Sequence, residues 1–317
     1  MRHSRRPLII AARGSPLARV QAESIGRFHG ELDPAVEIQY RWIETAQVHI
    51  DQDDQNGQDN RESAKDVFVR GVEEAVLTQS ADVAVHSLKD LPVTTRPDAR
   101  RLIVIAVPPR ADARDCLVGH HGPVPLDQLP HGATVGTSSP RRKAQLLRRR
   151  GDLQIAGIDG NVQTRLSRVQ QQREFDATVL AVAGLQRLGL GHLADGPLSV
   201  EAMAPAAGQG ALALQCRADD HTTIRRCLQL NDATSAAAVH AERQIVLALG
   251  ADCRHPLGVY VAIDGDEVEL TARVLSPDGR DCVDVIESGE VEQLPRLVNG
   301  VIKSLRGQGA EQMLNPS

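Results

Sequence analysis

The chain has 317 residues, a formal net charge of −5, a hydrophobic content of 41% and an aromatic content of only 2%. This length allows two or three domains with a sizeable core, which must be built mainly from Leu, Val, Ile and Ala. The acidic balance and the scarcity of aromatic rings argue against a nucleic-acid-binding protein, because such proteins need basic surfaces and rings on which bases can stack.

No targeting or membrane-spanning segment is recognisable. No apolar run approaches the roughly 20 residues that cross a bilayer. The basic residues 1–6 precede a short strand rather than a signal-peptide core. The five cysteines are scattered and lack the spacing of a zinc site. We therefore expect a cytoplasmic protein with no membrane partner, no bound metal and no disulfide framework.

A short apolar strand, a polar turn and a helix follow one another repeatedly in the first two thirds of the chain. Residues 8–12 lead through Arg13-Gly14-Ser15-Pro16 into a helix that reaches about residue 28, and strand 82–85 leads into the turn 86–90. Strands at 153–156 and 177–182 continue the pattern. The pattern predicts parallel or mixed sheets with helices on both faces, and such sheets bind ligands at the carboxyl ends of their strands.

Residues 46–64 interrupt this pattern, because they are rich in Asp, Asn and Gln and contain few apolar side chains. A loop of that length is typical of a lid over a binding site or of a disordered segment. We interpret it as an acidic lid.

The turn at residues 135–143 predicts an anion site. Ser139 suits a helix N-cap and Pro140 suits the first helical position, so a helix begins at Pro140. Arg141 and Arg142 then lie where the helix dipole disfavours cations, unless an anion compensates. Their forked guanidinium groups can form paired hydrogen bonds with carboxylates or phosphates. Because residues 13–16 have a similar pattern, we expect equivalent turns in two similar α/β domains with a cleft between them.

The last third has a different character. An alanine-rich helix at 233–249 precedes strands at 259–263, 267–274 and 281–286, and a final helix follows from about residue 290. These elements predict a small α+β domain with a three-stranded antiparallel sheet. We therefore divide the chain into a first domain of residues 1–112 and 205–228, a second of 113–204 and a third of 229–317.

Six ordered segments resemble the porphobilinogen deaminase (hydroxymethylbilane synthase) family over nearly the whole chain. They are residues 13–18 (Arg-Gly-Ser-Pro-Leu-Ala), 84–92, 135–142, 160–167, 180–189 and 205–211. The resemblance implies three domains, two of them like periplasmic binding proteins. It also implies a dipyrromethane cofactor linked through a thioether to Cys253. The implied activity is that of a transferase of haem and porphyrin biosynthesis, which joins four porphobilinogen molecules head to tail, releases ammonia, and hydrolyses off the linear tetrapyrrole hydroxymethylbilane. We expect it to act as a monomer on this small substrate.

The resemblance also implies the site residues. A growing chain of pyrroles carries many acetate and propionate groups, which arginines, lysines and hydroxyls can bind. Asp90 is the implied catalytic group, which passes a proton to the leaving amine and stabilises the azafulvene cation. The implied cofactor contacts are Cys253, Lys89, Ser87, Thr137, Ser138, Ser139, Arg141, Arg142, Arg165 and Asp159. The implied substrate contacts are Arg13, Ser15, Gln21, Lys65, Phe68, Arg187 and Gln209.

Several positions depart from the family pattern. Asp159 stands where the family has an arginine, so a carboxylate faces ligand carboxylates and repels them. The segment 45–48 lacks the family's Gly-Asp, Asp66-Val67 replaces a Gly-Leu pair, and Ala251-Asp252 replaces a glycine pair. These changes leave two alternatives open: a divergent paralogue with a different pyrrole substrate or a shorter product, and a non-catalytic anion-binding protein on the same scaffold.

Overall fold

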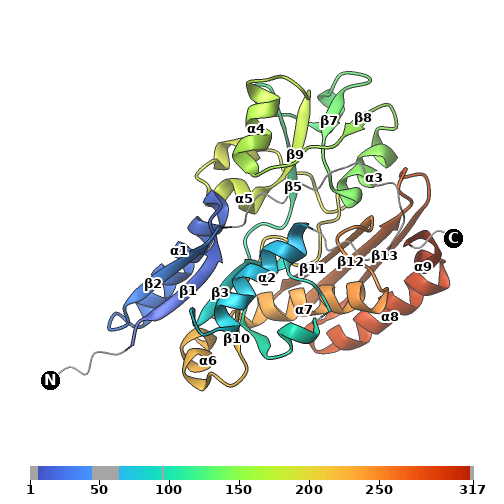
Figure 1. Ribbon diagram of the computed structural model, residues 1–317. Helices are drawn as coiled ribbons and strands as arrows, with labels where there is room; N and C mark the ends of the chain where they lie inside the picture. Colours follow the sequence, from blue (N-terminus) through green and yellow to red (C-terminus); the bar gives the residue numbers. More distant parts are fainter. Residues whose placement is uncertain (1–5, 45–63, 95, 315–317) are drawn as a thin grey trace. The chain divides into compact units, whose positions relative to one another are not determined.

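The computed structural model describes residues 6–44, 64–94 and 96–314, and its strands form three sheets (Figure 1). The chain divides into two compact units. Unit 1 comprises Met1–Pro108 and Leu212–Asp232, and unit 2 comprises Pro109–Ala211 and Ala233–Ser317. The acidic lid predicted at residues 46–64 lies outside the described residues, apart from Ala64.

Unit 1 is built on a five-stranded sheet with the order β2-β1-β3-β10-β4. Its first three strands are parallel, and β10 runs antiparallel to both of its neighbours. Apolar clusters lie on both faces, one with residues of α1 and the other with residues of α2. The elements are β1 (Leu8–Arg13), α1 (Pro16–Leu32), β2 (Ile38–Ile43), α2 (Ala64–Leu77), β3 (Val83–Ser87), the 3-10 turn η1 (Leu88–Asp90), β4 (Leu102–Ala106), β10 (Leu212–Arg217) and α6 (His221–Leu228).

The second sheet, in unit 2, has the order β6-β5-β9-β7-β8. Strands β8, β7 and β9 are parallel, and β5 is antiparallel to β9 and β6. This arrangement repeats that of unit 1, with β7 in the place of β1. The elements are β5 (Asp115–Gly119), β6 (Gly122–Pro123), β7 (Thr134–Gly136), α3 (Pro140–Arg149), β8 (Gln154–Ala156), α4 (Val162–Gln170), β9 (Ala177–Ala181) and α5 (Val182–Arg187).

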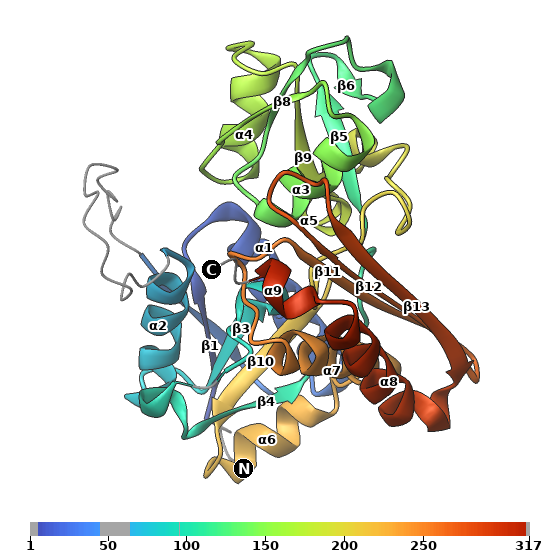
Figure 2. The ribbon, with the colours of Figure 1, turned by 90° about the vertical axis from the view of Figure 1, so that its right-hand side faces the viewer.

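The third sheet, also in unit 2, is an antiparallel meander in the order β11-β12-β13. Helices α7 and α8 pack against it, as Figure 2 shows. Its elements are α7 (Ala233–Ala248), β11 (Leu257–Asp264), β12 (Glu267–Leu275), β13 (Cys282–Glu290), α8 (Leu294–Gly307) and α9 (Ala310–Leu314). None of the helices within the described ranges combines the length and apolar character that a bilayer crossing demands.

The predicted fold class is confirmed: two similar α/β sheets and a small three-stranded antiparallel sheet. The turns at residues 13–16 and 137–140 follow β1 and β7, which hold equivalent positions, so the predicted equivalence of these turns is also confirmed. Each sheet falls within one of the three predicted domains, while their exact limits stay a prediction. Strands β2, β4, β5, β6 and β10 were not predicted, although β10 completes the first sheet and β5 the second.

Candidate functional site

The turn after β1 carries Arg13 and Ser15. The Gly14 N–H donates to the Ile43 carbonyl at 3.0 Å, and Ser15 Oγ caps α1 by accepting from the Ala18 N–H at 3.4 Å. Arg13 is half-buried, and this burial lowers the pKa of its guanidinium while the nearby Asp90 raises it. The turn therefore presents a hydroxyl and a cation that interacts with a carboxylate.

The second turn of unit 1 follows β3 and carries Ser87, Lys89 and Asp90. All three side chains are half-buried. Ser87 Oγ accepts from Gln21 Nε2 at 3.0 Å and lies 3.2 Å from Gln21 Oε1. Because Asp90 interacts electrostatically with Arg13, unit 1 brings together five of the predicted residues at one end of its sheet, namely Arg13, Gln21, Ser87, Lys89 and Asp90. Lys65 and Phe68 lie in α2, but their side chains are outside what the structure describes.

In unit 2 the turn after β7 is tied to the loop after β8. The Thr137 N–H donates to Ala156 O at 2.8 Å. Ser138 Oγ accepts from the Ile158 N–H and donates to the Ile158 carbonyl, both at 3.0 Å. Ser139 is the N-cap of α3, as predicted. Ser138 thus fixes the spacing of the two loops through both hydrogen bonds of its hydroxyl.

Arg141 and Arg142 are turned into the interior of unit 2, where only 4% and 7% of their surface is exposed. Each donates to Asp115, at 2.7 Å to separate carboxylate oxygens. Their other Nη atoms donate to backbone carbonyls. The anion expected at this helix start therefore exists, and it is Asp115 of the same chain. Contact of the two arginines with a ligand stays a prediction.

Asp159 and Arg165 belong to the loop after β8 and the helix that follows. Arg165 Nε donates to Gly160 O at 2.9 Å, and Asn161 caps α4. Gly160 has a φ of +105°, which allows the sharp turn. Asp159 is exposed between these fixed points, so its carboxylate faces solvent.

Arg187 and Gln209 are positioned by the segment that returns to unit 1. Arg187 Nη2 donates to Gly210 O at 2.7 Å, and burial lowers the pKa of its guanidinium to about 10. Gln209 is buried, and its Nε2 donates to Ala113 O at 2.6 Å and to Asp115 at 2.9 Å. Arg187 stays a cation at neutral pH, and Gln209 completes the shell of Asp115.

Cys253 lies at the corner of a tight turn between α7 and β11. The His255 N–H donates to Asp252 O at 3.2 Å, which closes the turn. The Asp252 carboxylate also accepts from the Arg254 N–H at 2.8 Å and from Arg254 Nε at 2.9 Å. Cys253 is exposed, whereas Cys116, Cys216 and Cys227 are buried. Since Cys282 is half-buried, Cys253 is the best presented of the five cysteines for reaction with an electrophile.

Sequence reasoning missed two fully buried carboxylates, Asp115 and Glu242. Glu242 Oε1 accepts from Arg110 at 2.6 Å and from the Val261 N–H at 2.9 Å, and Oε2 accepts from the Gly208 N–H at 2.7 Å. A carboxylate at the start of an otherwise apolar strand was the only available signal for Asp115.

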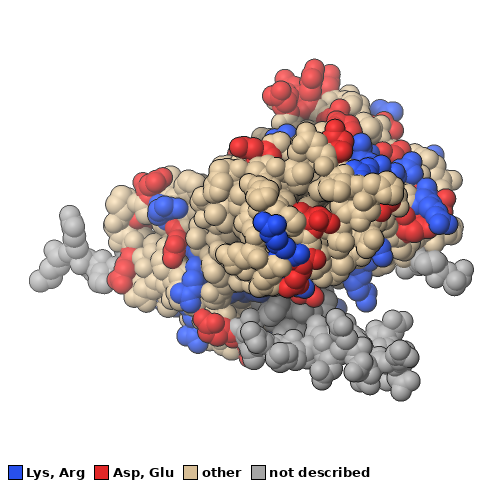
Figure 3. Space-filling view, turned by 90° about the horizontal axis from the view of Figure 1, so that it is seen from above, with Lys and Arg blue, Asp and Glu red and all other residues tan. Residues whose placement is uncertain are grey.

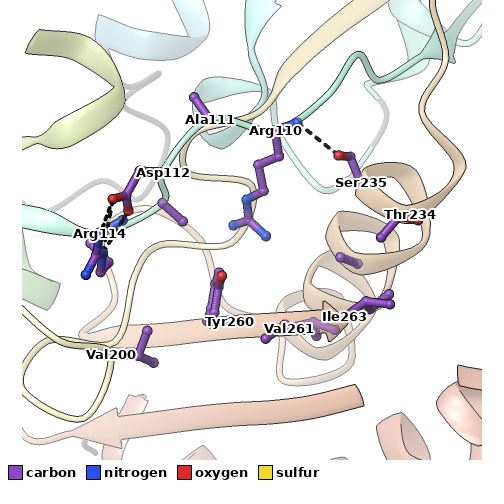
Figure 4. Close-up of a pocket in the computed structure, with 13 residues that line it drawn as sticks. Arg110, Ala111, Asp112, Arg114, Val200, Thr234, Ser235, Tyr260, Val261 and Ile263 are labelled. Atoms are coloured by element: carbon purple, nitrogen blue, oxygen red, sulfur yellow. Dashed lines mark hydrogen bonds and ion pairs between the residues drawn. The ribbon is translucent and has the colours of Figure 1, made fainter. Parts of the chain in front are cut away.

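A cavity of about 450 Å³ in unit 2 was also not predicted. Figure 4 shows Arg110, Tyr260 and the Asp112–Arg114 pair around it. Arg110 stacks over the Tyr260 ring at 5.0 Å. The two arginines that line the cavity already pair with carboxylates, Arg110 with Glu242 and Arg114 with Asp112. On the molecular face of Figure 3, acidic and basic side chains are interspersed.

Comparisons with known proteins match nearly the whole chain. Residues 8–225 match the family described as porphobilinogen deaminase, dipyromethane cofactor binding domain, and residues 236–303 match the one described as porphobilinogen deaminase, C-terminal domain. A porphobilinogen deaminase of Thermus thermophilus is 38% identical over 98% of both chains. A probable porphobilinogen deaminase of Methanopyrus kandleri is 48% identical over 68% of this chain and 70% of its own.

Among solved structures, the periplasmic aliphatic sulphonate binding protein SsuA of Escherichia coli aligns over 96% of this chain and 88% of its own, with 14% identity and a TM-score of 0.39. An arginine-specific periplasmic binding protein of Salmonella typhimurium aligns over 76% and 98%, with 11% identity and a TM-score of 0.41.

Proposed function

Because this chain belongs to the porphobilinogen deaminase family, we propose that it is a transferase that deaminates porphobilinogen and joins the pyrroles head to tail into hydroxymethylbilane. The observation that carries the proposal is the half-buried Asp90, which interacts with Arg13 at the carboxyl ends of β1 and β3. Such a position suits a carboxyl group that must act on a cationic centre while cations nearby bind the substrate's carboxylates.

The cations and hydroxyls of both units are proposed to bind acetate and propionate groups. Arg13, Ser15 and Lys89 of unit 1 and Arg165 and Arg187 of unit 2 supply the donors. Guanidinium groups bind carboxylates in a bidentate manner, which fixes orientation as well as charge. Arg141 and Arg142 are proposed to support the donors of unit 2 from the interior of that unit, because their pairing with Asp115 holds the start of α3 in place.

Asp90 is proposed to donate the proton with which the amine of porphobilinogen leaves as ammonia. The C–N bond breaks with its electron pair on nitrogen, and the remaining azafulvene is a cation. The carboxylate that results from the proton transfer then stabilises this cation. When the next pyrrole carbon forms the C–C bond, that carbon releases a proton, which can return to Asp90.

We further propose that a dipyrromethane is attached to Cys253. The donor chemistry fits such a group, because the Cys253 thiol is exposed and because arginines, a lysine and hydroxyls suit its carboxylates. When bound, the dipyrromethane supplies the pyrrole carbon to which the first substrate unit is added. Lys89, Ser87, Thr137 and Ser139 are the further residues proposed to hold it.

A second candidate, an altered product, is favoured by Asp159. Its exposed carboxylate would repel a chain of ligand carboxylates, so a shorter oligomer or a less acidic pyrrole would bind better. Since the substrate is a small soluble molecule, we propose that the protein acts in the cytoplasm and as a monomer.

The intact mass of denatured protein, made in cells that synthesise haem, tests the cofactor. The wild type should exceed its sequence mass by two pyrrole units, and Cys253→Ser should not. Cys282→Ser is the matched control and should keep the added mass. An unmodified wild type would refute attachment.

Chromatography of the product formed from porphobilinogen then decides between hydroxymethylbilane and a shorter oligomer, and Asp159→Arg should lengthen the product only in the second case.

A further inference from the structure

A chain of buried polar side chains runs through unit 1 behind the turn that carries Asp90. Nε2 of His86 lies 3.1 Å from Oε1 of Gln215. Gln215 Nε2 donates to Glu73 Oε1 at 3.0 Å, and Arg96 Nη2 donates to Glu73 Oε2 at 2.5 Å. His86, Gln215 and Glu73 are 7%, 6% and 3% exposed. Such a buried chain is costly unless every member is paired, so its arrangement is strongly determined.

The ion pair at one end sets the direction of every hydrogen bond. The Glu73 carboxylate, paired with Arg96, can only accept. Gln215 must therefore turn its NH₂ group toward Glu73 and its oxygen toward His86. Because that oxygen can only accept, Nε2 of His86 must carry the hydrogen, which leaves Nδ1 unprotonated.

This row of hydrogen-bonded side chains lies where the sheet is otherwise apolar. Ala213 of β10 is the register partner of His86, and Gln215 lies two residues further along the same face. That face packs against α2 through Ala84, Val72 and Val76. The chain thus links α2, β10 and the end of β3.

His86 is uncharged at neutral pH. Burial lowers the pKa of its imidazole to about 4, against smaller opposing effects of Gln215 and Asp90. Glu73 and Arg96 are the charged groups linked to it through Gln215 on the α2 side, and Arg13 at the end of the neighbouring strand β1 interacts with Asp90. Near neutral pH the His86 imidazole is therefore not one of the cations around Asp90.

Ser87, the next residue, is held from the opposite face. It pairs with the buried Gln21 of α1, so two consecutive residues at the end of β3 are each fixed by a buried glutamine. The turn η1 starts directly after them. We propose that Glu73, acting through Gln215, holds His86 in the neutral Nε2–H tautomer and thereby positions the Ser87–Asp90 turn for the reaction. The role in the reaction rests on the proposed function, whereas the tautomer does not.

The variant Glu73→Gln gives the sharpest test, because it should reverse the direction of the hydrogen bonds between residue 73, Gln215 and His86. Its single oxygen is drawn to Arg96, so its NH₂ group faces Gln215, whose amide must flip and offer its NH₂ group to His86. His86 then becomes the Nδ1–H tautomer. ¹⁵N NMR of the imidazoles distinguishes the two tautomers, and His86→Gln assigns the signal. Glu74→Gln, an exposed neighbour on α2, is the matched control and should change nothing. Gln215→Met keeps the bulk and should populate both tautomers.

In steady-state assays, Glu73→Gln should lower kcat roughly 10- to 100-fold, as displaced catalytic groups do, with little change in KM. An Nδ1–H tautomer or a protonated His86 in the wild type at pH 7 would overturn the proposal, and so would an unchanged tautomer in Glu73→Gln. A reversed tautomer with an unchanged kcat would exclude the positioning role. If the wild type forms no pyrrole oligomer, the proposed function fails, while the NMR result still judges the tautomer.

Discussion

Asp115→Asn should destabilise unit 2 severely. Asp115 is fully buried and is shared by two guanidinium groups, each 2.7 Å from one of its oxygens. The substitution keeps the size of the side chain and removes its charge. Arg141 and Arg142 then remain buried as two neighbouring cations without a compensating anion.

The magnitude follows from the burial of all three groups. Removing one partner of a buried ion pair costs about 3–5 kcal/mol. Here one carboxylate serves two cations that repel each other, so we expect the upper end, about 5 kcal/mol. That is a large part of the roughly 5–15 kcal/mol that stabilises a folded protein. It corresponds to a decrease in Tm of roughly 10–20 °C for a unit of this size.

Urea unfolding followed by far-ultraviolet circular dichroism measures this loss. The exposed Asp195→Asn, in the same unit, should change the free energy of unfolding by no more than about 0.5 kcal/mol. The double variant Asp115→Asn/Arg142→Met should recover part of the loss, because it removes one stranded cation. A loss below about 1 kcal/mol for Asp115→Asn alone would refute the ion-pair argument.

Three further predictions concern stability. The free energy of unfolding should fall by up to about 3 kcal/mol as pH decreases from 6.5 toward 4. The cause is that His86 in the unfolded protein gains a proton near its ordinary pKa of 6.5, whereas His86 in the folded protein gains one only near pH 4. Urea titrations across this range should show a flatter profile for His86→Gln. Gly279→Ala should cost about 1–3 kcal/mol in thermal unfolding, since its φ is +74° and a Cβ would meet the Ala144 carbonyl, whereas Gly265→Ala, with φ +57° and open space, should cost less. Glu242→Gln should cost about 3 kcal/mol or more, because it removes a buried charge that several donors share; guanidinium unfolding would contradict this if the midpoint were unchanged.

The predictions that succeeded depended on local signals. Ser139 and Pro140 have cap and first-turn preferences that act within a few residues, so the start of α3 could be read from the sequence. The echo of residues 13–16 in 137–140 likewise reflects one local solution to the same strand–turn–helix geometry. Gly265 and Gly279, both with a positive φ, lie in the turns between the C-terminal strands and are local signals of the same kind.

The partners of charged side chains could not be predicted. Arg141 meets Asp115 only because β5 pairs antiparallel with β9, which depends on contacts far apart in the sequence. The buried chain from Arg96 to His86 likewise requires β10 to insert beside β3. Sequence reasoning indicated correctly that the arginines need an anion, but it assigned that anion to a ligand.

The contacts of Glu242 also bear on how the nascent protein matures. Arg110 and Gly208 lie close to two of the three points at which the chain passes between the units, and both pair with the Glu242 carboxylate on α7, which is synthesised later. Unit 1 itself is finished only when β10 and α6 have left the ribosome. Because domains usually fold as they are synthesised, from the N-terminus onward, this order delays completion of both units. A truncated or prematurely released chain should therefore be captured by chaperones or degraded, and not accumulate as a half-functional fragment.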